Sequence, residues 1–328
     1  MNCFNLKYIL FILSFYHYAY QYNEVEKGIV SGNYQNAYDA GIIAIKTYPK
    51  ATWKIVHNTL LLADSLHKNT DIGLLSYEIG RRGACLDYLK SFSFYNDDHS
   101  LIDSAWQSGN ESFLKNFKQD YLDSLFNMIE RDQSIRNLGV SRDSIGVIDS
   151  FNMISFEGLV RKYGFPNEFV IGLRCKKIDR GHVINEGYFQ TMFRHFALRN
   201  YQTFKEILDN EFLKGSLDLY DYNEYLTTFY PNPINYVKNP FVKIESKYYQ
   251  ENFFVSVDSV NAVRKIYGLP SREDQLNSFI YKIKKPDSVF RIHGYANNIP
   301  KPPQHIAEKF MKIFTEIPIN NESSDPNH

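Results

Sequence analysis

Hydrophobic residues recur with steps of three and four positions over most of the chain, which is the spacing of one face of an α-helix. The clearest example is the stretch 50–67, where Trp53, Val56, Leu60 and Ala63 fall on one side of a predicted helix. The same spacing predicts helices within residues 31–48, 71–89, 111–136, 149–163, 188–198, 201–214, 219–230, 257–267 and 271–284, with Asp149 or Ser150 capping the helix within 149–163 and Ser271 capping the last. Gly80 and Gly83 interrupt the stretch 71–89, residues 167–187 are expected to form a loop or a frayed helix, and a short helix is expected within 305–314. The pattern therefore predicts an all-α protein.

Small residues form a flat stripe on the helix predicted after residue 33. Ala37, Gly41 and Ala44 lie on one face, and Pro49 ends the helix. This segment resembles the second helix of a tetratricopeptide repeat, although that family usually has an aromatic residue where Gly41 stands. A single repeat cannot bury its own face. The resemblance therefore implies an array of helical hairpins over residues 23–108, which we expect to dock a protein partner.

Polar residues interrupt the apolar face of the next predicted helix. Its apolar series is Leu114, Phe117, Tyr121, Leu125 and Met128. The next two positions of that series are Asp132 and Arg136, with Gln133 at the margin, and Asn152 lies on the apolar face of the following helix. Such a cluster can bind a polar ligand or position a water molecule. It can equally tie two helices together through satisfied hydrogen bonds, which is the interpretation we favour.

Short motifs occur in a recognisable order between residues 120 and 270. They are "DQSIR", "DSFNMISFEGLVRKYGFP", "IG" at 171–172, "RHF" at 194–196 and "VNAVRKIYGLP". Their order resembles that of an uncharacterised bacterial family of predominantly helical domains, for which we can name no activity. The chain departs from that pattern in an additional "DRGHVINEG" segment and in a Pro-rich segment after residue 230. The resemblance adds weight to a candidate site made of Asp132, Gln133, Arg136, Asp149, Asn152, His195, Asn261 and Arg264.

An apolar run near the N-terminus has the order of a secretory signal. One cation, Lys7, precedes the run from Tyr8 to Tyr20, which is too short for a stable membrane span. No pair of small residues marks a cleavage site at its end. We therefore predict a signal peptide over residues 1–22 and a periplasmic or secreted protein. An uncleaved N-terminal anchor and a cytoplasmic protein with an apolar first helix are the alternatives.

Composition and the absence of motifs exclude several classes of function. Lys and Arg total 37, as do Asp and Glu, so no net charge attracts nucleic acid. The sequence has no Cys-x-x-Cys pair, His-Glu-x-x-His motif, phosphate-binding Gly-rich loop or Gly-x-Ser-x-Gly elbow, so we predict no metal and no cofactor. Cys85 and Cys175 can form a disulfide or remain as buried thiols, and we slightly favour thiols.

These observations predict four segments and a binding function. The segments are a signal peptide (1–22), a tetratricopeptide-like array (23–108), a helical domain (109–285) and a C-terminal extension with a disordered tail (286–328). We expect an exported scaffold or binding protein that is not an enzyme. The alternative is a hydrolase-like or small-ligand pocket built on Asp132, Gln133, Arg136, Asn152 and His195.

Overall fold

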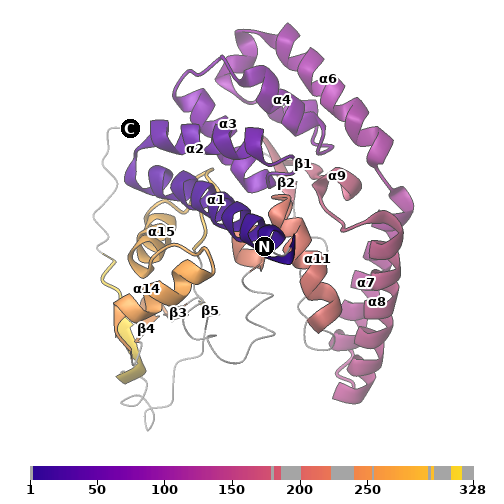
Figure 1. Ribbon diagram of the computed structural model, residues 1–328, viewed down its shortest axis with the longest axis vertical. Helices are drawn as coiled ribbons and strands as arrows, with labels where there is room; N and C mark the ends of the chain where they lie inside the picture. The colour runs from indigo at the N-terminus through magenta and orange to yellow at the C-terminus, as the bar shows by residue number, and fades with distance from the viewer. Residues whose placement is uncertain are drawn as a thin grey trace.

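The chain is mainly helical in its computed structural model, as predicted (Figure 1). The structure describes residues 3–178, 181–185, 201–222, 240–252, 255–294, 297–298 and 312–319. The predicted helix around His195, the Pro-rich segment up to residue 239 and the polar tail from residue 320 lie outside these ranges. Among the described residues, no helix combines the length and apolar character needed to cross a bilayer.

The first helices follow one another along the chain and pack against their neighbours. They are α1 (Cys3–Ser31), α2 (Tyr34–Thr47), α3 (Trp53–Ser65), α4 (Ile72–Gly80), α5 (Leu86–Leu89) and α6 (His99–Asn116). Helix α2 packs on α1 and α3, and α4 packs on α6. The four apolar residues predicted to line one face of α3 are all buried. The stack itself does not identify a repeat family, so the tetratricopeptide resemblance stays a prediction.

Glycines allow two of these helix pairs to approach closely. A Cβ atom on Gly41 would lie 2.0 Å from the Thr59 hydroxyl oxygen, so α3 lies too close to α2 for a side chain at this position. A Cβ on Gly80 would lie 2.1 Å from the carbonyl oxygen of Trp106, and one on Gly109 would lie 2.2 Å from that of Tyr77. The interruption expected within 71–89 therefore has a physical reason: α4 ends at Gly80, where it crosses α6, and the separate helix α5 follows.

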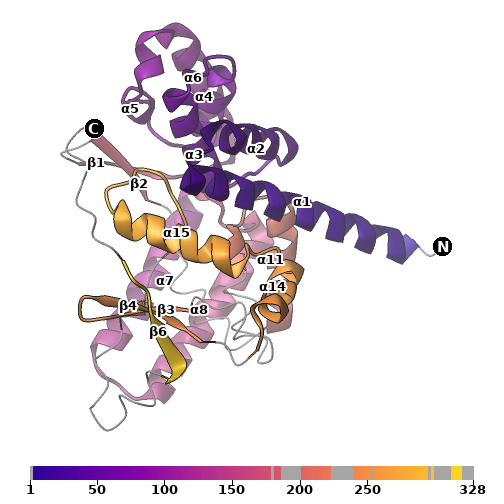
Figure 2. The same cartoon turned by 90° about the vertical axis from the view of Figure 1, so that its left-hand side faces the viewer.

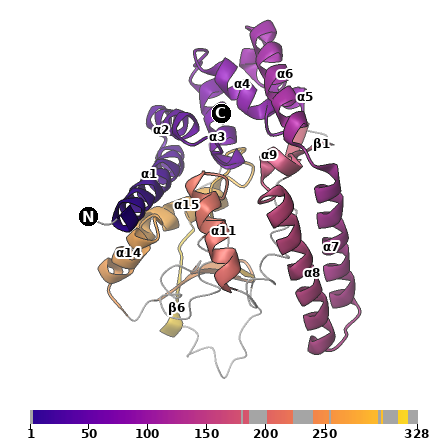
Figure 3. The same ribbon diagram turned by 45° about the vertical axis from the view of Figure 1, so that its right-hand side comes forward.

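Helices α7 (Gln119–Asn137) and α8 (Arg142–Tyr163) form a long antiparallel pair, which Figure 3 shows on the opposite side of the molecule from α14. Two boundaries differ from the prediction. The helix predicted from residue 111 is broken after α6, and this leaves Leu114 60% exposed. Helix α8 begins eight residues earlier than a cap at Asp149 would allow, because the cap is Ser141, which accepts a hydrogen bond from the Ser144 N–H. Its predicted end at Gly164 is confirmed.

Two small β-structures were not predicted. After the short helix α9 (Glu168–Ile171), strands β1 (Arg174–Ile178) and β2 (Gly181–Asn185) form an antiparallel hairpin where a loop or frayed helix was expected. A second sheet has the order β5-β3-β4-β6, with strands Asn297–Asn298, Phe241–Ile244, Lys247–Glu251 and Phe314–Glu316. Strand β6 includes Phe314, which was expected to end a helix. These strands are too short for periodicity to separate them from loops.

Three later helices agree with the prediction and complete the core. They are α11 (Tyr201–Leu213), α14 (Val257–Ile266) and α15 (Arg272–Lys284). Gly215 and Gly268 follow α11 and α14 with positive φ, and Ser271 caps α15 as expected. Helix α1 packs on both α11 and α15. One continuous core includes Tyr22, Trp53, Leu125 and Ile292, so it extends through all four predicted segments, whose boundaries stay predictions.

Cys85 is disulfide-bonded, which corrects the slight preference for buried thiols. Its partner is not among the described side chains.

Candidate functional site

The predicted polar cluster on α7 and α8 exists as a network between the two helices. Asp132 is fully buried and accepts a hydrogen bond of 2.6 Å from the Gln133 amide. The guanidinium of Arg136 lies 3.1 Å from an Asp132 carboxylate oxygen and 2.8 Å from one of Asp149. Arg136 therefore joins a carboxylate on α7 to a carboxylate on α8.

Arg131, which the sequence analysis missed, makes a second set of bonds between the same two helices. Arg131 donates two hydrogen bonds, of 3.1 and 3.0 Å, to the side-chain oxygen of Asn152. The Asn152 amide nitrogen in turn donates to the carbonyl oxygen of Met128 at 3.2 Å, and Asn152 is fully buried. Arg131 directly precedes Asp132, and this adjacency was the available signal. The polar groups of the cluster bond to one another, which is the behaviour of a structural connection between helices.

The other candidate residues do not join this network. Asn261 lies on α14, where its side-chain oxygen accepts from the Arg272 N–H at 2.9 Å. Arg264 is fully buried on the same helix and donates to the Pro270 carbonyl at 2.8 Å, and burial lowers its guanidinium pKa to about 10. His195 lies outside the described residues. The structure thus brings together Asp132, Gln133, Arg136, Asp149 and Asn152, and places Asn261 and Arg264 elsewhere.

A second buried polar cluster, which we call the Glu26 cluster, joins α1, α3 and two distant segments. It contains Tyr22, Glu26, Lys54, Asp218, Tyr220 and His293. The Lys54 ammonium lies 2.5 Å from a Glu26 carboxylate oxygen, and the two side chains are 13% and 6% exposed. The same ammonium lies 5.0 and 5.2 Å from the ring centroids of Tyr22 and Tyr220. The cation is therefore held by a carboxylate and two aromatic faces.

Further contacts close the Glu26 cluster. Tyr22 donates to Asp218, and the Tyr220 ring stacks on that of His293 with centroids 3.3 Å apart. The backbone N–H of His293 donates to Glu26 at 3.1 Å. Burial is the main cause that raises the pKa of Glu26, raises that of Tyr220 well above its ordinary value and lowers that of His293 well below it. The sequence signal was the four-residue step from Tyr18 through Tyr22 to Glu26.

Helix α3 also holds the segment that follows α15. His57 Nε2 lies 2.9 Å from the carbonyl oxygen of Val289, so this nitrogen must be the donor, and Nδ1 accepts from the Tyr88 hydroxyl at 2.5 Å. The Asn58 amide donates to the Arg291 carbonyl at 2.9 Å and accepts from the Arg291 N–H at 2.8 Å. Burial lowers the pKa of His57 to about 4, so the ring is neutral. These bonds fix residues 289–293 against the first helices.

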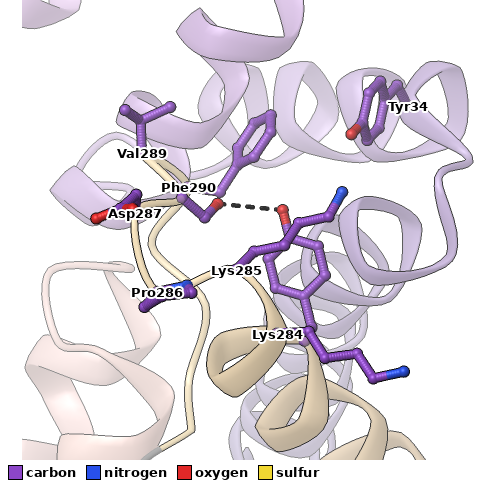
Figure 4. A pocket seen from close by; sticks show the side chains of 9 residues that line it. Tyr34, Lys284, Lys285, Pro286, Asp287, Val289 and Phe290 are labelled. Atoms are coloured by element: carbon purple, nitrogen blue, oxygen red, sulfur yellow. Dashed lines mark hydrogen bonds between the residues drawn. The ribbon is translucent and has the colours of Figure 1, made fainter. Parts of the chain in front are cut away.

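An open groove lies beside this fixed segment, between the start of α2 and the end of α15 (Figure 4). Its volume is about 480 Å³, and it is lined by Tyr34, Tyr281, Lys284, Lys285 and residues 286–290. The rings of Tyr34 and Phe290 have centroids 5.8 Å apart, and the hydroxyl groups of Tyr281 and Ser288 are 3.1 Å apart. We call it the Tyr34 groove; it combines aromatic surface with two exposed lysines.

Comparison with protein-family models, with curated proteins and with solved structures finds no match to this chain. The resemblance to an uncharacterised bacterial family therefore stays a hypothesis. Among the described residues, no group of three or more His, Cys, Asp or Glu side chains is placed to hold a metal ion.

Proposed function

We propose that the chain is an exported helical binding protein that docks a protein partner through its first helices, with the Tyr34 groove as the contact site. The observation that carries the proposal is the composition of that groove. Tyr34 offers partly exposed aromatic surface and packs against the buried ring of Phe290. Lys284 and Lys285 offer exposed ammonium groups beside it, and they outnumber the one exposed carboxylate of the lining, that of Asp287. The matching partner is a protein segment with an apolar side chain and a nearby carboxylate.

The residues on both sides of the Tyr34 groove are held in place by the fold, which supports a binding role. The segment 289–293 is attached to α3 through His57 and Asn58, as described above. Tyr34 stands at the first position of α2, directly after the capping residue Asn33. A site whose residues are ordered before binding loses less conformational entropy when the partner binds.

Export is supported by the Cys85 disulfide, since disulfides persist mainly in oxidising compartments.

The proposal is tested by capture of partners with the full chain and a charge-reversed variant. Lys284→Glu with Lys285→Glu should weaken binding at least tenfold, and wild-type binding should weaken as salt is raised. Lys265→Glu is the matched control, because Lys265 occupies the last turn of α14 as Lys284 occupies that of α15. Binding that the double variant retains, or that both variants lose equally, would contradict the proposal.

The alternative, a hydrolase-like or small-ligand pocket on Asp132, Gln133, Arg136, Asn152 and His195, has less support. The polar groups of the first four residues are bonded to one another or to Arg131 and Asp149. A ligand would have to compete with those bonds.

A further inference from the structure

The first helix continues past the predicted end of the signal peptide. Helix α1 runs from Cys3 to Ser31, and Tyr18, Ala19 and Tyr22 are at most 1% exposed. The Tyr18 hydroxyl donates to the carbonyl oxygen of Gly215 at 2.9 Å, and its ring packs edge-on against that of Phe212 at 5.3 Å. Cleavage after residue 22 would remove these side chains from the core. The fold therefore requires the end of this segment to be kept.

The beginning of the same helix leaves the body of the protein. Figure 2 shows the N-terminal half of α1 projecting from the packed helices. Residues 8–15 in this half are Tyr-Ile-Leu-Phe-Ile-Leu-Ser-Phe, so the helix is apolar around its whole circumference and has no polar stripe. Helices of that composition are found inside protein cores or in lipid.

We infer that α1 is retained in the mature protein and that its residues 8–15 insert into one leaflet of a lipid bilayer. At 1.5 Å per residue this stretch extends about 12 Å, less than half of a hydrocarbon layer of about 30 Å. Lys7 stands before the stretch, and its ammonium must reach the polar interface, so the helix lies obliquely in the leaflet. Tyr16 and Tyr20, 38% and 58% exposed, stand where the helix meets the body. Tyrosine is a residue type enriched at the membrane interface.

The charge of the segment indicates that apolar contact, not attraction to anionic lipid, holds it in place. Lys7 is the single cation before Lys27, and the whole chain has balanced charge. The protein should therefore bind vesicles of zwitterionic lipid with the same affinity as vesicles that contain anionic lipid.

The inference is tested on the full chain by intact mass and by flotation with vesicles of phosphatidylcholine, with and without phosphatidylglycerol. The mature protein should contain residues 2–22 and float with both vesicles. Leu10→Asp with Leu13→Asp should reduce the floating fraction at least tenfold and leave the melting temperature unchanged, because the inference assigns Leu10 and Leu13 to lipid, whereas Tyr18, Ala19 and Tyr22 join α1 to the core. Ile154→Asp removes an exposed apolar side chain of α8 and is the control for nonspecific binding to lipid; this variant should float like the wild type.

Three results would overturn the inference. A mature mass that lacks residues 1–22 would show that the helix is cleaved. Flotation that is equal for the wild type and the Leu10→Asp, Leu13→Asp variant would place the lipid contact elsewhere. Oligomers that depend on Leu10 and Leu13, without flotation of the wild type, would make a second copy of the chain the occupant. The Tyr34 groove is not involved, so the two proposals fail independently.

Discussion

The two buried polar clusters of this protein differ in the distance along the chain that they connect. In the α7–α8 network, hydrogen-bonded partners are at most 24 positions apart. In the Glu26 cluster, the bond from His293 to Glu26 spans 267 positions. The first cluster fastens one helical hairpin, whereas the second fixes the segment that follows α15 to helix α1. Loss of a partner should therefore loosen one hairpin in the first case and destabilise the whole fold in the second.

The largest expected effect is that of Lys54→Met. This change leaves the Glu26 carboxylate buried without its cation, and breaking a buried pair in this way costs about 3–5 kcal/mol of unfolding free energy. Lys46→Met is the matched control. Lys46 is 57% exposed in its ion pair with Asp71, so its loss should cost about 0–1 kcal/mol. Urea denaturation of both variants gives the comparison, and equal losses would contradict the special role of the Glu26 cluster.

A second large effect is acid sensitivity around α3. The folded pKa of His57 is about 4, below its ordinary value of 6.5, so the unfolded chain binds this proton more readily. Stability should fall as the pH is lowered from about 6.5 to about 4, by about 3 kcal/mol for this group at about 1.4 kcal/mol per unit. The lowered pKa of His293 acts in the same direction, and the raised pKa of Glu26 acts in the opposite one.

The variant His57→Gln isolates the contribution of that residue. Because glutamine does not titrate, the loss of melting temperature between about pH 6.5 and pH 4 should be smaller than in the wild type. An unchanged pH dependence would mean that His57 is not held neutral by its environment.

A smaller and more local effect is expected for Asn152→Ala. It removes the acceptor of two Arg131 bonds and the donor to Met128, a loss of about 1–3 kcal/mol. Amide exchange should accelerate in α7 and α8 and stay slow in α3. Equal acceleration in both regions would remove the distinction between the two clusters.

The smallest effect is expected for Lys284→Glu with Lys285→Glu. Both side chains are exposed, so the free energy of unfolding should stay within about 0.5 kcal/mol for each change. Thermal unfolding checks this. A much larger loss would mean that weakened partner binding reports unfolding and not a change in the Tyr34 groove.

The sequence could predict contacts between residues that are close along the chain, but not contacts between residues that are far apart along it. Helical spacing located the burial of Asp132 and Asn152 because both lie on long amphipathic helices with regular steps. It could not locate the Glu26 cluster, because Lys54, Asp218 and His293 meet Glu26 only after the chain has folded. The same limit explains the missed sheet, since β3 pairs with the distant residues of β5 and β6 lies beside β4.

The role of the glycines shows a second limit of prediction from the sequence. The helix-breaking tendency of Gly80 was visible in the sequence, but its purpose was not. Its partner Gly109 lies on another helix, and only the crossing of α4 and α6 shows why both positions lack a side chain.

The most direct test of the account is the thermal stability of Asp132→Asn beside the wild type, each scanned with and without small metabolites and metal ions. If the α7–α8 network is structural, the variant should lose about 1–3 kcal/mol of stability, and no added compound should shift either protein. Wild-type stability in the variant, together with a ligand-induced shift that only the wild type shows, would contradict the account and make the cluster a binding site.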